Sequence, residues 1–435
     1  MFENKKKLFL TICFHLVFLL VSFQVTNAQN NLTYYITAAT QNSPLINDNK
    51  NQNKANLLES ERLKAFYTKP QIGITANYLF SPIISTDNNI TRFEPNAKTA
   101  DNYVGYDLAV SNSGLYQALV NVTQPLFNGE RYKTASTQFN IASQINLNNA
   151  KISAHDIEKI VTDQYILCLQ DNKQTQYAEA MVKLLDEQKT ILKKLTEGSI
   201  YKQSDLTLLN IEHQNFLAQL LTFKATYRRD LMDLNILCGI NDTTLIQLQN
   251  INLGLSGNVS NSLFLEKYNL DSLNLIAQQK IFELKYKPQV NLFANTGLNA
   301  VYAPTIPQRF GLNAGISFTY NFFDGNQKKI NQNKTQILEQ SVSYYKENFI
   351  TQNTVRKSKI YIELQSYTDR VSIAKQQLKD YDLLLSNYKK EIVLGQLSIL
   401  NYIMVLKNIA TVQRDYTLLF SQQQALINAY NYWNW

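Results

Sequence analysis

Two long stretches of the chain contain neither glycine nor proline, the residues that most often end a helix. The first runs from Glu130 to Glu197, sixty-eight residues, and the second from Asn326 to Leu394, sixty-nine residues. All thirteen glycines and eight prolines lie outside these two stretches. Each stretch is therefore predicted to form one helix roughly 100 Å long, which is several times the diameter of a compact domain.

Apolar residues recur within both stretches at steps of three and four, the spacing of one face of a helix. They include Ile141, Ile145, Ile152, Ile160 and Leu167 in the first stretch, and Ile330, Ile337, Val342, Phe349 and Ile360 in the second. An apolar stripe of this kind needs partner helices, as in a coiled coil. An ordinary long structural coiled coil also fits this pattern.

Shorter stretches without glycine or proline can supply the partner helices. Residues 199–238 and 262–286 together would form about 97 Å of helix, close to the length of the long helix beside them. Residues 396–435 repeat this arrangement in the second half, with residues 49–67 supplying the remaining part.

Residues 1–28 have the features of a signal peptide. Three lysines at positions 5–7 precede an apolar segment from Leu8 to Val25, and small residues end the segment at Ala28. A retained anchor helix is the alternative, although polar residues interrupt the apolar segment. No later stretch approaches about 18 consecutive apolar residues, so no transmembrane helix is expected in the mature chain.

The sequence shows no motif for catalysis, a metal or a cofactor, and an enzyme is not expected. Cys168 and Cys238 are too few for a disulfide framework or a zinc site and are predicted on apolar helix faces. His155 and His213 have no ligand set or nucleophile near them in sequence. The net charge of +8 includes +2 from the signal region, and the remaining +6 is spread thinly over the mature chain, without the basic and aromatic patch that nucleic-acid binding needs.

Two short motifs occur twice, which indicates an internal tandem duplication. Lys-Pro-Gln at residues 69–71 returns at residues 287–289, and the Phe-Asn-Gly at residues 127–129 is matched by Phe-Asp-Gly at residues 323–325. After the signal peptide, the predicted organisation has three parts. These are a first repeat over residues 29–240, an equatorial linker over residues 241–261 and a second repeat over residues 262–435.

Between the repeated motifs the apolar spacing changes to two, which is the pattern of a strand with one apolar face. Four strands are predicted, with apolar residues at even positions: Ile72, Ile74, Ala76, Tyr78 and Phe80; Tyr116, Ala118, Val120 and Val122; Val290, Leu292, Ala294 and Leu298; Leu312, Ala314, Ile316, Phe318 and Tyr320. A soluble sheet could show this pattern, but the rest of the chain offers little core to cover it. Strands of about ten residues with aromatic ends fit a membrane barrel.

Four strands cannot close a barrel, and open sheet edges are not tolerated in lipid. Several copies of the chain are therefore expected to share one barrel.

The ordered set of these motifs resembles the TolC-type outer-membrane efflux proteins over essentially the whole mature chain. The resemblance rests on the repeated Lys-Pro-Gln strand starts, on residues 124–129 (Gln-Pro-Leu-Phe-Asn-Gly) between strand and helix, and on the turns around Gly198 and Gly395. Residues 42–45 (Asn-Ser-Pro-Leu) resemble the segment that opens the first helix in this family.

The resemblance implies an α+β membrane protein that assembles as a homotrimer. Four strands per chain would form a twelve-stranded β-barrel in outer-membrane lipid, which continues into a long α-helical barrel in the periplasm. Its partners would be a periplasmic adaptor protein and an inner-membrane pump of the RND or ABC type.

The resemblance also assigns residues at the helical tips. Those expected to contact the adaptor are Gly198, Ser199, Ile200, Gly395, Gln396, Leu397 and Ser398. Both tip glycines are also expected to end their helices in the left-handed conformation, whether or not an adaptor binds. Some members carry a carboxylate ring at the tunnel entrance where this chain has Asn401 and Met404, and Asp205 is a further entrance candidate.

The function that follows is a passive exit duct of a tripartite efflux system, which exports small molecules across the outer membrane. A type I protein-secretion duct shares these features and is one alternative. A secreted structural coiled-coil protein, from another class, is the second.

Overall fold

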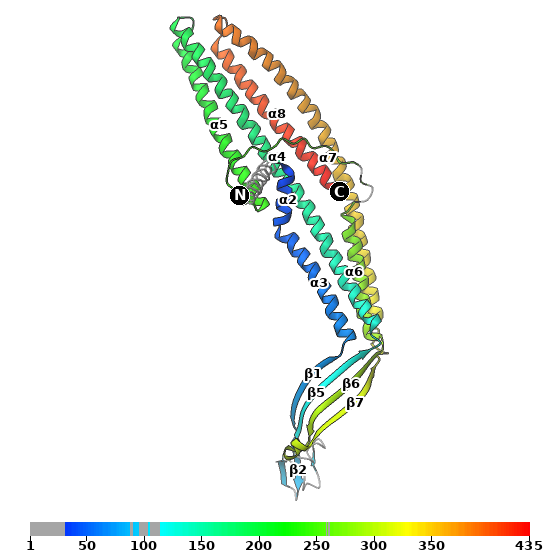
Figure 1. The fold of residues 1–435 in the computed structure, drawn as a ribbon. Helices are drawn as coiled ribbons and strands as arrows, with labels where there is room; N and C mark the ends of the chain where they lie inside the picture. Colours follow the sequence, from blue (N-terminus) through cyan, green and yellow to red (C-terminus); the bar gives the residue numbers. More distant parts are fainter. Residues whose placement is uncertain (1–30, 88–89, 95–102, 105–113, 258, 260–261) are drawn as a thin grey trace, which may run out of the picture. The chain divides into compact units, whose positions relative to one another are not determined.

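The computed structural model describes residues 31–435 except 88–89, 95–102, 105–113, 258 and 260–261 (Figure 1). The predicted signal peptide lies outside these described residues. The described chain divides into two compact units. The helical unit comprises residues 31–50, 148–266 and 345–435, and the sheet unit comprises residues 51–147 and 267–344.

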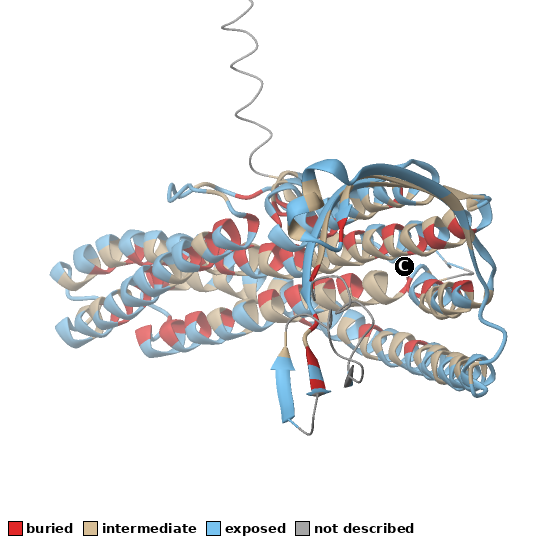
Figure 2. Cartoon of the chain, turned by 90° about the horizontal axis from the view of Figure 1, so that it is seen from below, coloured by how far each residue is buried: buried red, intermediate tan, exposed pale blue. Residues whose placement is uncertain are grey.

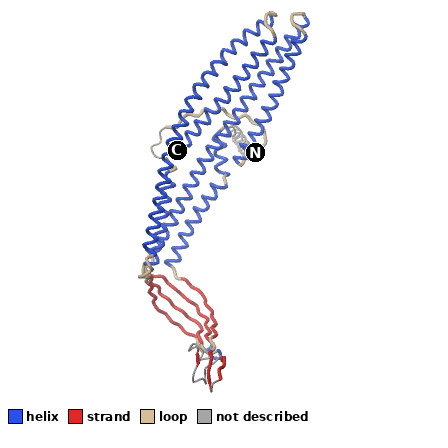
Figure 3. Tube along the Cα trace, turned by 180° about the vertical axis from the view of Figure 1, so that it is seen from behind, coloured by secondary structure: helices blue, strands red, loops and turns tan. Residues whose placement is uncertain are grey.

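The two stretches without helix breakers each form a single helix, as predicted. Helix α4 spans Gly129–Glu197 with 69 residues, and helix α7 spans Gln327–Val393 with 67 residues. Figure 3 shows them as uninterrupted helical traces. Because neither stretch contains a residue that breaks the backbone hydrogen-bond ladder, each helix ends only where a turn follows.

The predicted partner helices are also present. Helix α5 (Gln203–Cys238) follows α4, and helix α8 (Ile399–Trp433) follows α7. Helix α6 (Leu265–Glu283) continues into a short 3-10 helix, η2 (Leu284–Tyr286). Helix α5 stops at Gly239, which has φ 65° and donates its backbone N–H to the carbonyls of Asn235 and Ile236.

The N-terminal helices begin earlier than predicted. Helix α3 (Pro44–Thr68) opens within residues 42–45, as the resemblance implied, although the helical stretch itself was predicted only from residue 49. Helix α2 (Leu32–Asn42), which precedes it, was not predicted. The side chain of Asn31 caps α2 by accepting the backbone N–H of Tyr34 at 2.8 Å. Pro44 then opens α3, and Ser43 before it is extended because proline disfavours a helical residue at that position.

The four predicted strands form one antiparallel sheet in the sheet unit. They are β1 (Gln71–Phe80), β5 (Gly114–Leu126), β6 (Gln289–Ala300) and β7 (Phe310–Thr319), in the spatial order β1-β5-β6-β7. A short 3-10 helix, η3 (Ala303–Gln308), connects the last two strands.

A second, smaller sheet was not predicted. It contains β2 (Ile83–Asp87), β3 (Ile90–Glu94) and β4 (Tyr103–Val104), in the order β3-β2-β4. These strands have two to five residues, too few for an alternating pattern to stand out from its surroundings.

The register of the large sheet places all even-numbered residues on one face. Ile74 pairs with Val120, Val120 pairs with Thr296, and Leu292 pairs with Ile316. Since every pairing joins even to even or odd to odd, the apolar sets of the four strands merge into one surface. Gln124 and Thr296 are polar exceptions on this face, and the apolar exceptions on the other face are Leu79, Leu115, Leu119 and Phe293.

The core of the helical unit consists of two clusters of buried side chains. The tip cluster joins residues of α4, α5, α7 and α8, among them Leu185, Leu209, Ile392 and Tyr402. The equatorial cluster joins α2, α4 and α5, among them Tyr35, Tyr165, Cys168, Leu231, Leu234 and Cys238. Figure 2 shows buried residues recurring along the helices between exposed ones, as an amphipathic stripe requires.

The segment after α5 follows an extended path without helix or strand over its described residues 240–257. Side chains of the surrounding helices bind its backbone. Tyr227 Oη donates to the Ile246 carbonyl at 2.6 Å, and Asn431 Nδ2 donates to the Gly254 carbonyl at 2.9 Å. Gln424 Oε1 accepts the Leu253 N–H at 2.6 Å.

Candidate functional site

The first candidate site is the turn between α4 and α5. The Ile200 N–H donates to the Leu195 carbonyl at 2.9 Å, and the Gly198 N–H donates to the Lys194 carbonyl at 3.0 Å. Ser199, with φ 60°, is the residue in the left-handed conformation. The prediction that Gly198 would be this residue is therefore wrong.

The turn between α7 and α8 has the predicted glycine geometry. Gly395 has φ 71°, and the Gln396 N–H donates to the Glu391 carbonyl at 2.9 Å. A Cβ placed on Gly395 would lie 2.8 Å from Ile200 Cγ2. Gly395 thus permits both the turn and the close approach of the other turn.

Tyr201 links the two turns, a role that the sequence did not reveal. Its hydroxyl is within hydrogen-bonding distance of two carbonyls, that of Leu397 at 2.8 Å and that of Ile392 at 3.2 Å. Burial is the main reason why the pKa of this hydroxyl is raised. Nothing in the local spacing marks this tyrosine, because its partners lie more than 190 residues away.

The structure brings the predicted tip residues of both turns together. Gly198, Ser199, Ile200, Gly395, Gln396 and Ser398 are all exposed at this end of the helical unit. Leu397 is an exception because it is only 7 % exposed and packs in the tip cluster. Its side chain supports the turn from within.

The three entrance candidates lie near the starts of two helices, Asp205 in α5 and Asn401 and Met404 in α8. The carboxylate of Asp205 accepts the backbone N–H of Lys202 at 3.1 Å, so it caps the first turn of α5. Asn401 and Met404 lie three residues apart on the exposed side of α8, with Tyr402 and Ile403 buried between them. Asp205 therefore has a local structural role that the sequence analysis did not assign.

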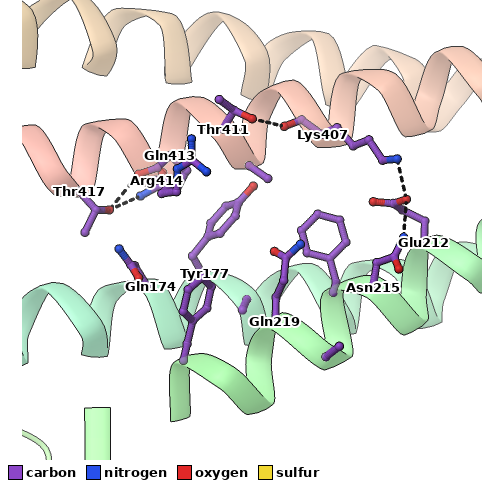
Figure 4. A pocket seen from close by; sticks show the side chains of 15 residues that line it. Gln174, Tyr177, Glu212, Asn215, Gln219, Lys407, Thr411, Gln413, Arg414 and Thr417 are labelled. Atoms are coloured by element: carbon purple, nitrogen blue, oxygen red, sulfur yellow. Dashed lines mark hydrogen bonds and ion pairs between the residues drawn. The ribbon is translucent and has the colours of Figure 1, made fainter. Parts of the chain in front are cut away.

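A pocket of about 460 Å³ lies between α4, α5 and α8 (Figure 4). At its edge Lys407 Nζ of α8 lies 3.1 Å from Glu212 Oε2 of α5. The Glu212 side chain is 6 % exposed and the Lys407 side chain is 58 % exposed. Asn215 Nδ2 also donates to Glu212 Oε2, at 3.3 Å. No local sequence pattern marks this pair, because its members are distant along the chain.

Side chains of the metal-binding types are not gathered together in the described part of the chain. None of the described His, Cys, Asp and Glu side chains gather in a group of three that could hold a metal ion. His213 Nε2 lies 2.9 Å from Asp186 Oδ1, which makes an ion pair when the imidazole is protonated. Among the helices described, none is both long and apolar enough to cross a membrane.

The second candidate site is the even-numbered face of the large sheet. Its apolar side chains are open to solvent in the single chain: Ile74 is 79 % exposed, Leu312 is 78 % exposed and Ile316 is 69 % exposed. The opposite face carries polar contacts, such as the bond from Asn121 Nδ2 to Thr75 Oγ1 at 2.8 Å. One wall of this sheet is therefore suited to lipid and the other to water.

Aromatic side chains mark both ends of the sheet. Tyr78 and Tyr116 pack with ring centroids 5.1 Å apart at the end remote from the helices. At the helix junctions, Phe127 is 90 % exposed, Phe322 is 88 % exposed and Phe323 is 81 % exposed. Aromatic residues in these positions are typical of strands that cross a membrane interface.

Comparison with known proteins gives no match in sequence and a clear match in structure. No protein-family model matches the chain, and no curated protein matches it. The outer membrane protein VceC of Vibrio cholerae superposes with a TM-score of 0.67 at 13% identity, over 93% of this chain and 95% of that chain. The outer membrane channel CmeC of Campylobacter jejuni gives a TM-score of 0.66 at 10% identity, over 93% of this chain and 85% of that one.

A third structure, the open state of the MtrE outer membrane channel of Neisseria gonorrhoeae, gives a TM-score of 0.63 at 10% identity, over 93% of this chain and 88% of that chain. The likeness spans the helices and the sheet together, since it covers nearly the whole of the described chain. The chain has the fold of the TolC-like outer-membrane efflux channels.

Proposed function

We propose that this protein is the outer-membrane exit duct of a tripartite efflux system, in which small molecules pass through it without chemical change. The observation that carries the proposal is the register of the large sheet, which gathers the apolar residues of all four strands on one exposed face. The fold shared with solved outer-membrane channels supports the same conclusion.

The sheet supports a barrel made by several copies of the chain. Strands β1 and β7 each pair on one side only among the described residues, so both sheet edges are open. Open edges are not tolerated in a bilayer, and three copies of four strands make the twelve that the family resemblance implies. The even-numbered face would then contact lipid, and the odd-numbered face would line a water-filled lumen.

The paired turns are the proposed contact for a periplasmic adaptor, which would connect the duct to an inner-membrane pump of the RND or ABC type. Six of the seven predicted residues are exposed there. Leu397 and Tyr201 would act indirectly, because they hold the two turns in one arrangement. A photo-crosslinker at Gln396 should capture the adaptor, whereas one at Asn313 in the sheet should not. Equal capture at both positions would contradict this assignment.

The proposed function is tested in a bacterial strain that lacks the gene. We expect the strain to retain a fluorescent pump substrate and to recover export when the wild-type gene is restored. The protein should fractionate with the outer membrane and have the mass of a trimer in detergent. Recovery in the soluble fraction as a monomer would instead favour a secreted coiled coil, and loss of an exported protein with normal dye export would favour protein secretion.

Two neighbouring substitutions in β7 make the test specific to the sheet faces. Ile316→Arg places a charge on the apolar face and should cost about 2–4 kcal/mol near mid-bilayer, enough to block assembly and export. Ser317→Arg places the same charge on the opposite face and should assemble. Equal loss with both variants would count against a lipid-facing even side.

A further inference from the structure

Two carboxyl groups meet in the interior of the helical unit, on helices α4 and α5. Asp171 and Asp230 are each only 4 % exposed. The Asp171 carboxyl lies within hydrogen-bonding reach of the Asp230 carboxyl. Gln164 Nε2 of α4 donates to the backbone carbonyl of Asp230 at 2.9 Å, which holds the two helices at this level.

Within the described part of the chain, only one of the two carboxyl groups forms an ion pair with a cation. Arg229 Nε lies 2.7 Å from Asp230 Oδ1, and this arginine is otherwise largely exposed. Asp171 Oδ2, by contrast, is buried and receives no hydrogen bond from an N–H or O–H donor among the described residues. A buried carboxylate oxygen without a donor is costly, so its protonation is favoured.

The other titratable groups near the pair do not supply a second cation. Cys168 lies one turn before Asp171 on α4, and Tyr227 and Asp233 lie on α5. Burial and the neighbouring Asp230 raise the pKa of Asp171 to about 7, and Arg229 opposes this effect. Burial also acts to raise the pKa of Asp230, but hydrogen bonds with Arg229 and Asp171 leave it lowered.

We propose that Asp171 and Asp230 form a proton-binding site that fastens α4 to α5 while it holds one proton. The proton lies between the two carboxyl groups, so that Asp171 donates an O–H···O bond to the ionised Asp230. When the proton leaves, two buried carboxylates face each other and the helices separate more easily at this level. The site makes this part of the helical unit sensitive to the pH of its surroundings and does not depend on the proposed export function.

The sign of the effect follows from proton linkage. In the open or unfolded chain Asp171 titrates near its ordinary value of about 4, whereas in the folded pair it titrates near 7. Between these values the closed state binds more protons than the open state. The stabilisation is therefore fully present below about pH 4, decreases as the pH rises, and is absent above about pH 7, with a change in opening of up to tenfold per pH unit.

Two native cysteines provide a local reporter and its control. Cys168 is fully buried beside Asp171, and Cys238 is fully buried farther along α5. Both thiols are free, and burial raises the pKa of each. Each thiol can react only after the structure around it opens locally. In the opened state both thiols ionise alike, so the ratio of their two labelling rates removes the effect of thiol ionisation.

The experiment measures N-ethylmaleimide labelling of both cysteines by mass spectrometry in the full mature chain in detergent, from pH 5.5 to 7.5. The ratio of Cys168 to Cys238 labelling should rise more than tenfold in the wild type. It should stay flat in Asp171→Asn, because the amide donates to Asp230 at every pH. Asp233→Asn is the matched control, which removes a nearby carboxyl outside the pair and should keep the rise.

A flat ratio in the wild type overturns the proposal without any variant. An equal rise in Asp171→Asn also overturns it, because the pair would then not be the titrating group. If Asp171→Asn does not fold, Asp230→Asn replaces it. Its amide can donate to the Asp171 carboxylate, so the rise should again vanish, and a persistent rise would refute the site.

Discussion

At the scale of single residues, the sheet contains one glycine that its geometry requires. Gly297 has φ 146°, and a Cβ placed on it would lie 2.1 Å from the Ala118 carbonyl oxygen of the neighbouring strand. Gly297→Ala should therefore force the strands apart and destabilise the protein by more than about 2 kcal/mol. The measurement is the urea midpoint of the assembled protein in detergent.

Gly73→Ala is the matched control for this prediction. Gly73 also lies on the odd-numbered face of a strand, but nothing lies within 4 Å of the position of its Cβ. The change should alter stability by less than about 0.5 kcal/mol. Similar effects of the two substitutions would show that the close approach at Gly297 is not limiting.

The turns show how far single residues can be predicted from sequence. Gly395 was predicted in the left-handed conformation and adopts it, whereas at the first turn Ser199 takes that conformation in place of Gly198. At the end of α7, the residue directly after the glycine, Gln396, donates its N–H five residues back to the Glu391 carbonyl. At the end of α4 the equivalent bond comes from the second residue after the glycine, Ile200, which donates to the Leu195 carbonyl. A glycine in sequence marks a turn but does not fix which residue has positive φ.

At the scale of secondary-structure elements, the Lys407–Glu212 pair joins α8 to α5 with unequal burial. Lys407→Met leaves the buried Glu212 carboxylate without its cation and should destabilise the protein by about 1–3 kcal/mol. Glu212→Gln leaves an exposed lysine that water can solvate, and it should cost less than about 1 kcal/mol. Urea unfolding of both variants measures the difference in the free energy of unfolding. Equal losses of stability would show that the unequal burial of the two side chains does not determine the cost.

Helices and strands with long sequence patterns were predicted, and those with short patterns were missed. The four long helices and four large-sheet strands follow from breaker positions and from apolar spacing over ten or more residues. Helix α2 was missed because its only start signal is Asn31, within a polar context. Contacts between distant residues, such as Tyr201 with Leu397, leave no local pattern and required the structure.

At the scale of the whole molecule, the polarity of the two sheet faces distinguishes a membrane barrel from a soluble sheet. Sequence spacing alone assigned an apolar and a polar face to each strand, but their alignment depends on register. A slip of one residue between any two strands would have mixed the faces. The observed pairings keep even residues beside even residues across the whole sheet, so the apolar surface is continuous.

Cysteine substitutions at neighbouring positions of β7 test which solvent each face contacts. A cysteine at Ser317 should react with a small water-soluble thiol reagent in the assembled protein and reduce dye export once it is labelled. A cysteine at Ile316 should react only with a lipid-soluble reagent, because the even face would be covered by acyl chains. The native Cys168 and Cys238 are fully buried, and their slow labelling in the unsubstituted protein gives the background. Equal reactivity of both introduced cysteines with the aqueous reagent would exclude a lipid-covered face, and with it the shared barrel.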